Sequence, residues 1–70
     1  MIGIEIFRTR LRDLRKEKKL SARELAEKLS VRDSTIIRWE NGTMVPTIDK
    51  LYDLARFFGV TADYLLGLED

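Results

Sequence analysis

The sequence has 70 residues, no cysteine, no histidine and a formal net charge of +1. This length leaves room for one small core in a single domain, residues 1–70, and the composition excludes disulfides, thiolate metal sites and histidine-based catalysis, so we expect no enzyme, metal or cofactor. The charge is unevenly spread, since residues 1–20 hold seven basic and three acidic residues whereas residues 43–70 hold two basic and five acidic ones.

The first predicted element is an amphipathic helix that ends near Lys18. Its apolar residues recur at spacings of three and four, which is typical of a helix with one buried face: Ile4, Phe7, Leu11 and Leu14. Residues 1–7 are interrupted by the charged Glu5 and are too short for a signal sequence or a membrane span. We therefore expect a cytoplasmic protein with no membrane partner.

A second and a third helix follow, separated by three residues. Ser21 followed by Glu24 is the pattern of a capping box, and apolar residues come after it at helical spacing: Ala22, Leu25, Ala26 and Leu29. The third helix is predicted over residues 33–41, because Gly42 suits a left-handed stop. Two short helices joined by such a turn are typical of a helix-turn-helix motif, here over about residues 21–41.

Two more helices complete the chain. Thr47 is a suitable N-cap and Gly59 a suitable stop for a helix whose apolar residues are Ile48, Leu51, Leu54, Ala55 and Phe58. Thr61 suits the cap of a short last helix that reaches Leu66 and ends at Gly67. No segment has the alternating pattern of a strand, so we predict an all-α fold, a compact bundle of five helices.

The outer face of the third helix decides what the motif can bind. At about 100° per residue, one arc collects a mixed polar set: Asp33, Ser34, Ile37, Arg38 and Asn41. The opposite arc is predicted to face the core: Thr35, Ile36, Trp39 and Glu40. An arginine can bond guanine, an aspartate can accept from cytosine, and an isoleucine can contact a thymine methyl. Periodicity alone does not separate such a DNA-reading face from a merely solvated one.

Residues spread over the first four predicted helices and the segments that follow them carry a resemblance to a known family: Leu14-Arg15, Leu20-Ser21, Glu24-Leu25-Ala26, Val31, Ser34-Thr35-Ile36, Trp39-Glu40-Asn41-Gly42, Pro46, Leu54-Ala55 and Gly59-Val60. From about Phe7 to Gly67 the chain resembles the Cro/C1 (Xre) family of lambda-repressor-like domains. The resemblance implies a five-helix bundle in which the third helix reads operator bases in the major groove. The start of the second helix and the loop after the third then hold phosphates.

The resemblance also implies roles for individual residues. Base reading is expected at Arg32, Asp33, Ser34, Ile37 and Arg38. Phosphate contacts are expected at Lys19, Ser21, Ala22, Arg23, Asn41 and Thr43, with the backbone amides that run on to Val45. Among these, Ile37 comes from the helix arc, Lys19 from its charge, and Arg23 as a substitute for a glutamine common in the family. An internal salt bridge is implied between Arg15 and Glu40.

Some positions depart from the family's pattern. Arg32 stands where a serine or threonine cap is usual, which leads to the hypothesis that Asp33 caps the third helix and that this helix begins one residue late. Lys19 and Ser30 stand where glycine is common, so each requires a left-handed backbone at a modest cost. Trp39 lies on the inner arc, which favours core packing over stacking on nucleic acid.

These residues together predict a sequence-specific binder of double-stranded DNA that regulates transcription on the nucleoid, by family expectation as a repressor. We expect a homodimer on an operator with an inverted repeat, and no small-molecule ligand. Candidates for the dimer surface are Met44, Val45, Tyr64, Leu65 and Leu68. The alternative is a protein-interaction module of antitoxin or adaptor type with secondary DNA binding, which the near-zero net charge and the neutral loop at residues 43–45 favour.

Overall fold

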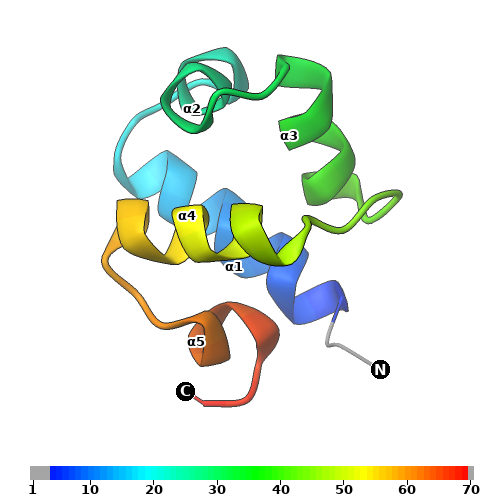
Figure 1. The fold of residues 1–70 in the computed structure, drawn as a ribbon, viewed down its shortest axis with the longest axis vertical. Helices are drawn as coiled ribbons and strands as arrows, with labels where there is room; N and C mark the ends of the chain where they lie inside the picture. Colours follow the sequence, from blue (N-terminus) through cyan, green and yellow to red (C-terminus); the bar gives the residue numbers. More distant parts are fainter. Residues whose placement is uncertain (1–3, 70) are drawn as a thin grey trace.

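Residues 4–69 are described by the structure, a computed structural model, and form five helices and no strand in that range (Figure 1). The helices are α1 (Ile4–Glu17), α2 (Ala22–Leu29), α3 (Asp33–Asn41), α4 (Ile48–Phe58) and α5 (Ala62–Leu66). All five predicted helices are present, which confirms the all-α fold. Over residues 4–69, no helix combines the length and the apolar character that crossing a membrane requires.

The helices begin and end at the residues whose local chemistry favours caps. Three hydroxyls each accept a hydrogen bond from the backbone amide three residues further on, and they belong to Ser21, Thr47 and Thr61. Each bond satisfies an amide that has no partner within its own helix. The predicted left-handed backbone is also present, with φ of 56° at Lys19 and 57° at Ser30.

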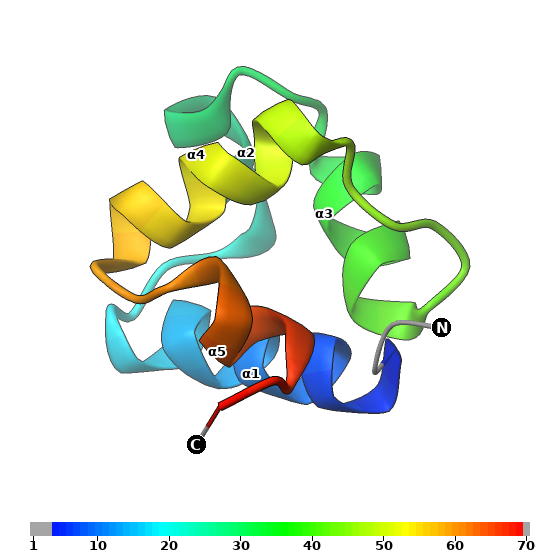
Figure 2. The ribbon, with the colours of Figure 1, turned by 60° about the horizontal axis from the view of Figure 1, so that its bottom comes forward.

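One hydrophobic core joins all five helices. Its buried members are Phe7, Leu11, Leu25, Ala26, Leu29, Ile36, Trp39, Leu54, Ala55 and Leu65. Helix α1 packs against α3 and α5, while α2 packs against α3 and α4 (Figure 2). Each fully buried leucine, isoleucine or phenylalanine side chain contributes ~1.5–3 kcal/mol. Removal of these apolar side chains from water therefore holds the helices together.

One predicted side-chain placement is wrong. Leu65, a candidate for the dimer surface, is 0% exposed because α5 turns it into the core. Ile48, one of the apolar residues that mark the fourth predicted helix, is 85% exposed. It lies in the first turn, ahead of the half-buried Leu51 and the buried Leu54, so this end of the helix projects beyond the core.

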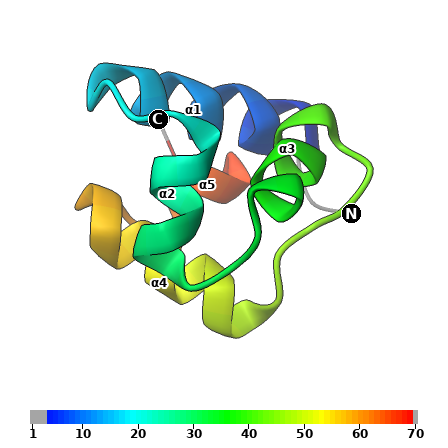
Figure 3. The same cartoon turned by 90° about the horizontal axis from the view of Figure 1, so that it is seen from above.

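Helices α2 and α3 form the predicted helix-turn-helix. The amide of Val31 in the turn donates to the carbonyl of Ala26 at 3.0 Å, which closes the end of α2. Lys50 of α4 also binds this end, since its Nζ donates to the carbonyl of Leu29 at 2.8 Å. The two helices lie side by side on the opposite side of the molecule from α5 (Figures 1 and 3).

Candidate nucleic-acid interface

The outer face of α3 is exposed and its inner face is buried, as the helix arc predicts. Solvent reaches five side chains on one side: Asp33, Ser34, Ile37, Arg38 and Asn41. On the other side Ile36 and Trp39 are buried, and Thr35 and Glu40 are half-buried. The guanidinium of Arg38 makes no hydrogen bond or ion pair within residues 4–69, so its donors remain available to a ligand.

The exposed side chains of α3 offer donors, acceptors and an apolar surface together. Ser34 and Arg38 are four residues apart and therefore lie one above the other on the same stripe of the helix. The fork of Arg38 can donate two hydrogen bonds to guanine, and the hydroxyl of Ser34 can donate or accept. Ile37 between them can pack against a thymine methyl. This face has the chemistry needed to distinguish base pairs.

The start of α3 shows that the hypothesis of an Asp33 cap is wrong. Arg32 is the N-cap, because its backbone is extended and its carbonyl accepts from the amides of Thr35 and Ile36 at 3.0 and 3.4 Å. Asp33 is already the first helical residue, and its Oδ1 accepts from the amide of Ser34 at 2.8 Å. A carboxylate in the first turn is also favoured by the helix dipole. The side chain of Arg32 makes no capping bond.

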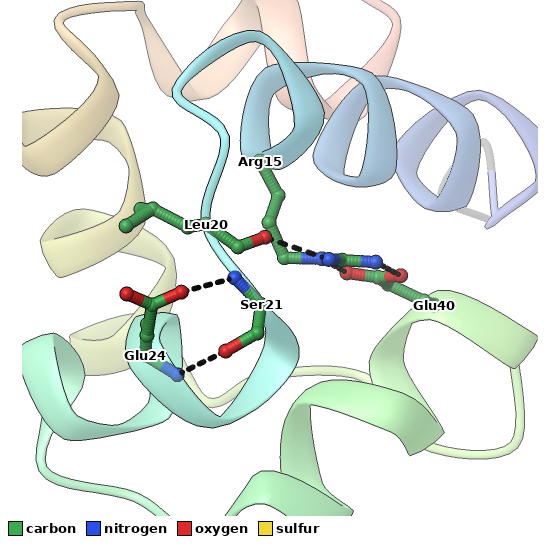
Figure 4. Close-up of polar contacts among 5 residues, drawn as sticks. All are labelled: Arg15, Leu20, Ser21, Glu24 and Glu40. Atoms are coloured by element: carbon green, nitrogen blue, oxygen red, sulfur yellow. Dashed lines mark hydrogen bonds and ion pairs between the residues drawn. The ribbon is translucent and has the colours of Figure 1, made fainter.

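The start of α2 is a closed capping box (Figure 4). The amide of Ser21 donates to Oε1 of Glu24 at 2.8 Å, and the amide of Glu24 donates to Oγ of Ser21 at 3.0 Å. The bond from the Ser21 amide, helped by the Ser21 hydroxyl and by Lys28, lowers the pKa of the Glu24 carboxyl. In the first turn, the amides of Ala22 and Arg23 have no acceptor in the described chain. They lie where a helix N-terminus binds phosphate.

An ion pair between Arg15 and Glu40 ties α1 to α3 (Figure 4). Nε and Nη2 of Arg15 donate to the two carboxylate oxygens at 2.6 and 2.9 Å, and Nη1 donates to the carbonyl of Leu20 at 2.9 Å. The two side chains are only 15% and 12% exposed. The hydrogen bonds to Glu40 raise the pKa of Arg15. The pair implied by the family resemblance is therefore present, and it positions α3 relative to the segment that starts α2.

Several polar groups of the loop after α3 form hydrogen bonds with the last residues of that helix. The amide of Thr43 donates to the carbonyl of Arg38 at 3.1 Å and to Oδ1 of Asn41 at 3.0 Å, and the Thr43 hydroxyl donates to the same oxygen at 2.7 Å. The amide of Met44 donates to the Arg38 carbonyl at 3.3 Å. Two of the amides expected to hold phosphate thus close the end of α3 instead. The side-chain NH₂ of Asn41 has no acceptor in residues 4–69 and is a remaining donor here.

Two arginines of α1 donate hydrogen bonds to backbone carbonyls of distant segments, and the sequence analysis did not predict these bonds. Nε of Arg8 donates to the carbonyl of Glu40 at 3.0 Å, and Nη1 of Arg10 donates to the carbonyls of Tyr64 and Glu69. These contacts join residues at least 32 positions apart, so no local pattern signals them. The exposed cations that flank or lie within the helix-turn-helix are Lys19, Arg23, Lys28, Arg32 and Arg38.

Comparison with known proteins agrees with this arrangement. A family described as a helix-turn-helix domain matches residues 9–70, which is most of the chain. The chain belongs to the Cro/C1 (Xre) family of helix-turn-helix domains. The match includes the whole of α2 and α3, and the family resemblance of the sequence is therefore confirmed.

This helix-turn-helix domain is similar to several regulators. It is 46% identical over 61 residues to the HTH-type transcriptional regulator YobD of Bacillus subtilis, a match that covers 87% of this chain and 54% of YobD. It is 36% identical over 55 residues to the cryptic phage CTXphi transcriptional repressor RstR of Vibrio cholerae, which covers 79% of this chain and 50% of RstR. The chain therefore spans about half the length of these curated relatives.

A solved structure shares the fold. The P22 c2 repressor, crystallised in complex with a synthetic operator, superimposes with a TM-score of 0.85 at 26% sequence identity. The match covers 91% of this chain and 97% of that one. The five-helix architecture is therefore that of the lambda-repressor-like domains.

Proposed function

We propose that this domain binds double-stranded DNA at a specific sequence and regulates transcription, as a repressor, with α3 in the major groove of the operator. The exposed arc of α3 carries this proposal, since Ser34, Ile37 and Arg38 face solvent on a helix whose other side is anchored in the core. Base reading requires side chains held in a fixed register, and a rigid helix provides this. The P22 c2 repressor, which shares the fold, is bound to an operator in its own structure.

Arg38 and Ser34 are the first candidates for base contacts, with Ile37 and Arg32 beside them. Asp33 differs from these because its carboxylate already accepts from the amide of Ser34. It contacts a cytosine only if it leaves that bond or shares its second oxygen. We therefore assign Asp33 a smaller part in base selection than Arg38.

Phosphate contacts flank this reading face on two sides. At the start of α2 the donors are the hydroxyl of Ser21, the amides of Ala22 and Arg23, and the side chains of Lys19 and Arg23. After α3 they are the side-chain amide of Asn41 and the segment at Thr43. Contacts of this kind position the domain on DNA and carry no sequence information themselves.

We expect a symmetric homodimer on an inverted repeat. A single domain has few exposed cations near its helix-turn-helix, and two copies double the number of phosphate contacts. The half-sites then lie about one helical turn, ~34 Å, apart. Such a regulator acts in the cytoplasm, on the nucleoid. We expect this role to be binding without catalysis. The carboxylate of Glu24, which an acid–base reaction would need to be free, accepts a hydrogen bond from the Ser21 amide in the cap of α2.

The proposal is tested by selecting bound duplexes from a random pool and titrating the selected sequence against scrambled DNA at two salt concentrations. We expect an enriched inverted repeat, and an affinity whose logarithm falls by about 0.9 per log unit of salt for each phosphate neutralised. Arg38→Ala should lower the preference for the selected sequence by about 10- to 100-fold and leave affinity for scrambled DNA nearly unchanged.

Arg12→Ala is the matched control, since Arg12 is an exposed arginine of α1 outside the helix-turn-helix. Equal effects of the two substitutions would contradict base reading by Arg38. If no duplex is enriched at concentrations at which the chain is folded, the antitoxin- or adaptor-type interaction module replaces the DNA-binding proposal.

A further inference from the structure

The segment that follows α3 has few groups with which to hold a phosphate. The side chains of residues 43–45 carry no charge, and two amides of this segment donate to the carbonyl of Arg38. The end of α3 is also the negative end of the helix dipole, which repels an anion. Among the side chains here, Asn41 supplies a donor through its NH₂ group. A phosphate bound at this position therefore requires a cation from another part of the chain.

Arg8 of α1 lies against this segment. Figures 2 and 3 show the first turns of α1 beside the end of α3. Nε of Arg8 donates to the carbonyl of Glu40 at 3.0 Å. A Cβ added to Gly42 would come within 2.9 Å of Cδ and 3.3 Å of Nε of Arg8, so the glycine that ends α3 also leaves room for the arginine.

The guanidinium of Arg8 has donors left for a ligand. An arginine has five N–H donors in a planar fork. Nε binds the carbonyl of Glu40, and Nη1 donates to Oε1 of Glu5 at 2.8 Å. Nη2 has no acceptor within residues 4–69, and the side chain is 31% exposed. The bond to the Glu40 carbonyl thus fixes the fork beside the end of α3 and leaves Nη2 available to an anion.

Glu5 is the group that competes with such an anion. Its side chain is 83% exposed and lies three residues before Arg8 on the surface of α1. Ion pairs between exposed side chains are weak, because water screens both charges. A phosphate, which is an anion with several acceptor oxygens, can therefore replace the Glu5 carboxylate at Nη1 at little cost.

We propose that Arg8 contacts a DNA phosphate beside Asn41 and supplies the cation that the segment after α3 lacks. The inference rests on the proposed function and adds a residue of α1 to its phosphate contacts. Arg15 has a different role, because its guanidinium is engaged by Glu40 and the carbonyl of Leu20. A contact to the DNA backbone strengthens binding to every sequence alike.

The first test measures affinity for the selected duplex and for a scrambled one over a series of salt concentrations. Arg8→Ala should lower both affinities by about tenfold and leave the ratio between them unchanged. The slope of log affinity against log salt should become shallower by about 0.9 for each bound domain, since one phosphate per domain is no longer neutralised. Thermal unfolding of the variant sets the temperature at which it is folded.

Arg56→Ala is the matched control for the salt experiment. It removes an exposed arginine from the last turn of α4, where Nη1 of Arg56 bonds the hydroxyl of Tyr52 in the same helix. This end of α4 is the one farther along the chain from the segment after α3. A salt slope that Arg8→Ala changes no more than Arg56→Ala overturns the proposal.

Neutral phosphates separate a direct contact from a structural role of Arg8. Phosphates of the selected duplex are replaced by uncharged methylphosphonates, one position at a time. The wild type should lose about tenfold in affinity at the phosphate that Arg8 contacts, and Arg8→Ala should lose little more at that position. At phosphates held by the start of α2, both proteins should lose equally. If Arg8→Ala has the same losses as the wild type at every position, Arg8 contacts no phosphate and the proposal is overturned.

A substitution of Glu5 tests the competition. Glu5→Gln keeps the bond from Arg8 to the Glu40 carbonyl and should raise affinity for both duplexes by about threefold, since it removes the competing carboxylate. Asp13→Asn is the control, because it makes the same change of charge at an exposed residue of α1 that has no ion pair in residues 4–69. Equal gains in the two variants overturn the competition between Glu5 and a phosphate.

Arg38→Ala separates this inference from the proposed function. If only the Arg8 contact is wrong, Arg38→Ala still lowers sequence preference, while Arg8→Ala keeps the salt slope of the wild type. If the DNA-binding function itself is wrong, no duplex is enriched from the pool, and neither arginine variant changes binding to DNA.

Discussion

The two helices of the helix-turn-helix begin in different ways. At the start of α2, Ser21 and Glu24 satisfy each other's amides and leave two amides free for a ligand. At the start of α3, the side chain of Arg32 makes no capping bond. The carboxylate of Asp33, the first residue of the helix, accepts a hydrogen bond from the amide of Ser34 instead. This difference indicates that hydrogen bonds within its own first turn stabilise α2. Helix α3 depends instead on contacts with other helices, made near its C-terminal end.

Those tertiary contacts are the Arg15–Glu40 ion pair and the packing of Trp39. Substitutions that remove them should therefore cost more stability than substitutions at either helix start. Changes at the two starts should in turn affect α2 and α3 unequally. Four expected outcomes follow this order, from the largest effect to the smallest.

Glu40→Ala should have the largest effect. It leaves the mostly buried guanidinium of Arg15 with the carbonyl of Leu20 as its remaining acceptor and should lower the free energy of unfolding by about 3 kcal/mol. Urea unfolding measures this. The control is Glu27→Ala, which removes an exposed glutamate of α2 that makes no ion pair in residues 4–69. Equal losses in the two variants would show that α3 does not depend on the pair.

Ser21→Ala should lower the free energy of unfolding by about 1 kcal/mol, because it removes the oxygen that accepts from the Glu24 amide. Ser34→Ala makes the same chemical change in the first turn of α3, where the hydroxyl has no hydrogen-bond partner in the described structure. We expect its effect to stay within about 0.5 kcal/mol. The pair of variants, measured by the same unfolding experiment, tests whether α2, unlike α3, has a side-chain cap.

Arg32→Ser should stabilise the protein by about 0.5 kcal/mol, since it supplies the cap that α3 lacks. This substitution makes the start of α3 resemble that of α2. Arg23→Ser is the control, because residue 23 lies inside the first turn of α2 and is not a cap position. Thermal unfolding measures both, and a gain as large in Arg23→Ser would point to charge removal as the cause.

The smallest effect concerns pH. The pKa of the Glu24 carboxyl is lowered from 4.5 by its bonds in the capping box, so this contribution to stability is present above pH 4.5 and is lost as pH falls through the lower folded value. Glu24→Gln keeps a neutral acceptor and should flatten the fall in stability as the pH drops below about 4.5. Glu27→Gln, at an exposed glutamate of α2 outside the capping box, is the control. A parallel slope for all three proteins would contradict the role of the carboxylate.

The sequence was enough to predict the helices because their signals are local. Ser21 and Glu24 are three residues apart, and Gly42 directly follows the helix that it ends. The arc of α3 was predictable for the same reason, since one helical period relates Ser34 to Arg38. The Arg15–Glu40 pair joins residues 25 positions apart, and the family resemblance pointed to it where local spacing did not.

The remaining features depend on contacts between distant segments. The bond of Arg8 to the Glu40 carbonyl and that of Lys50 to the Leu29 carbonyl arise only when the helices have packed. The exposure of Ile48 is similar, because the apolar pattern of α4 continues past the point where the core ends. The Asp33 cap was predicted wrongly because Arg32, whose side chain is no cap, nevertheless has the backbone of one.

Trp39 is the one tryptophan of the sequence and is 2% exposed on the inner side of α3. Its indole is therefore a built-in optical probe of whether the reading helix is docked on the core. Emission at short wavelength reports a docked helix, and a shift to longer wavelength reports water reaching the ring. Because the ring lies behind the contact surface, a duplex that binds without moving α3 should leave this fluorescence unchanged.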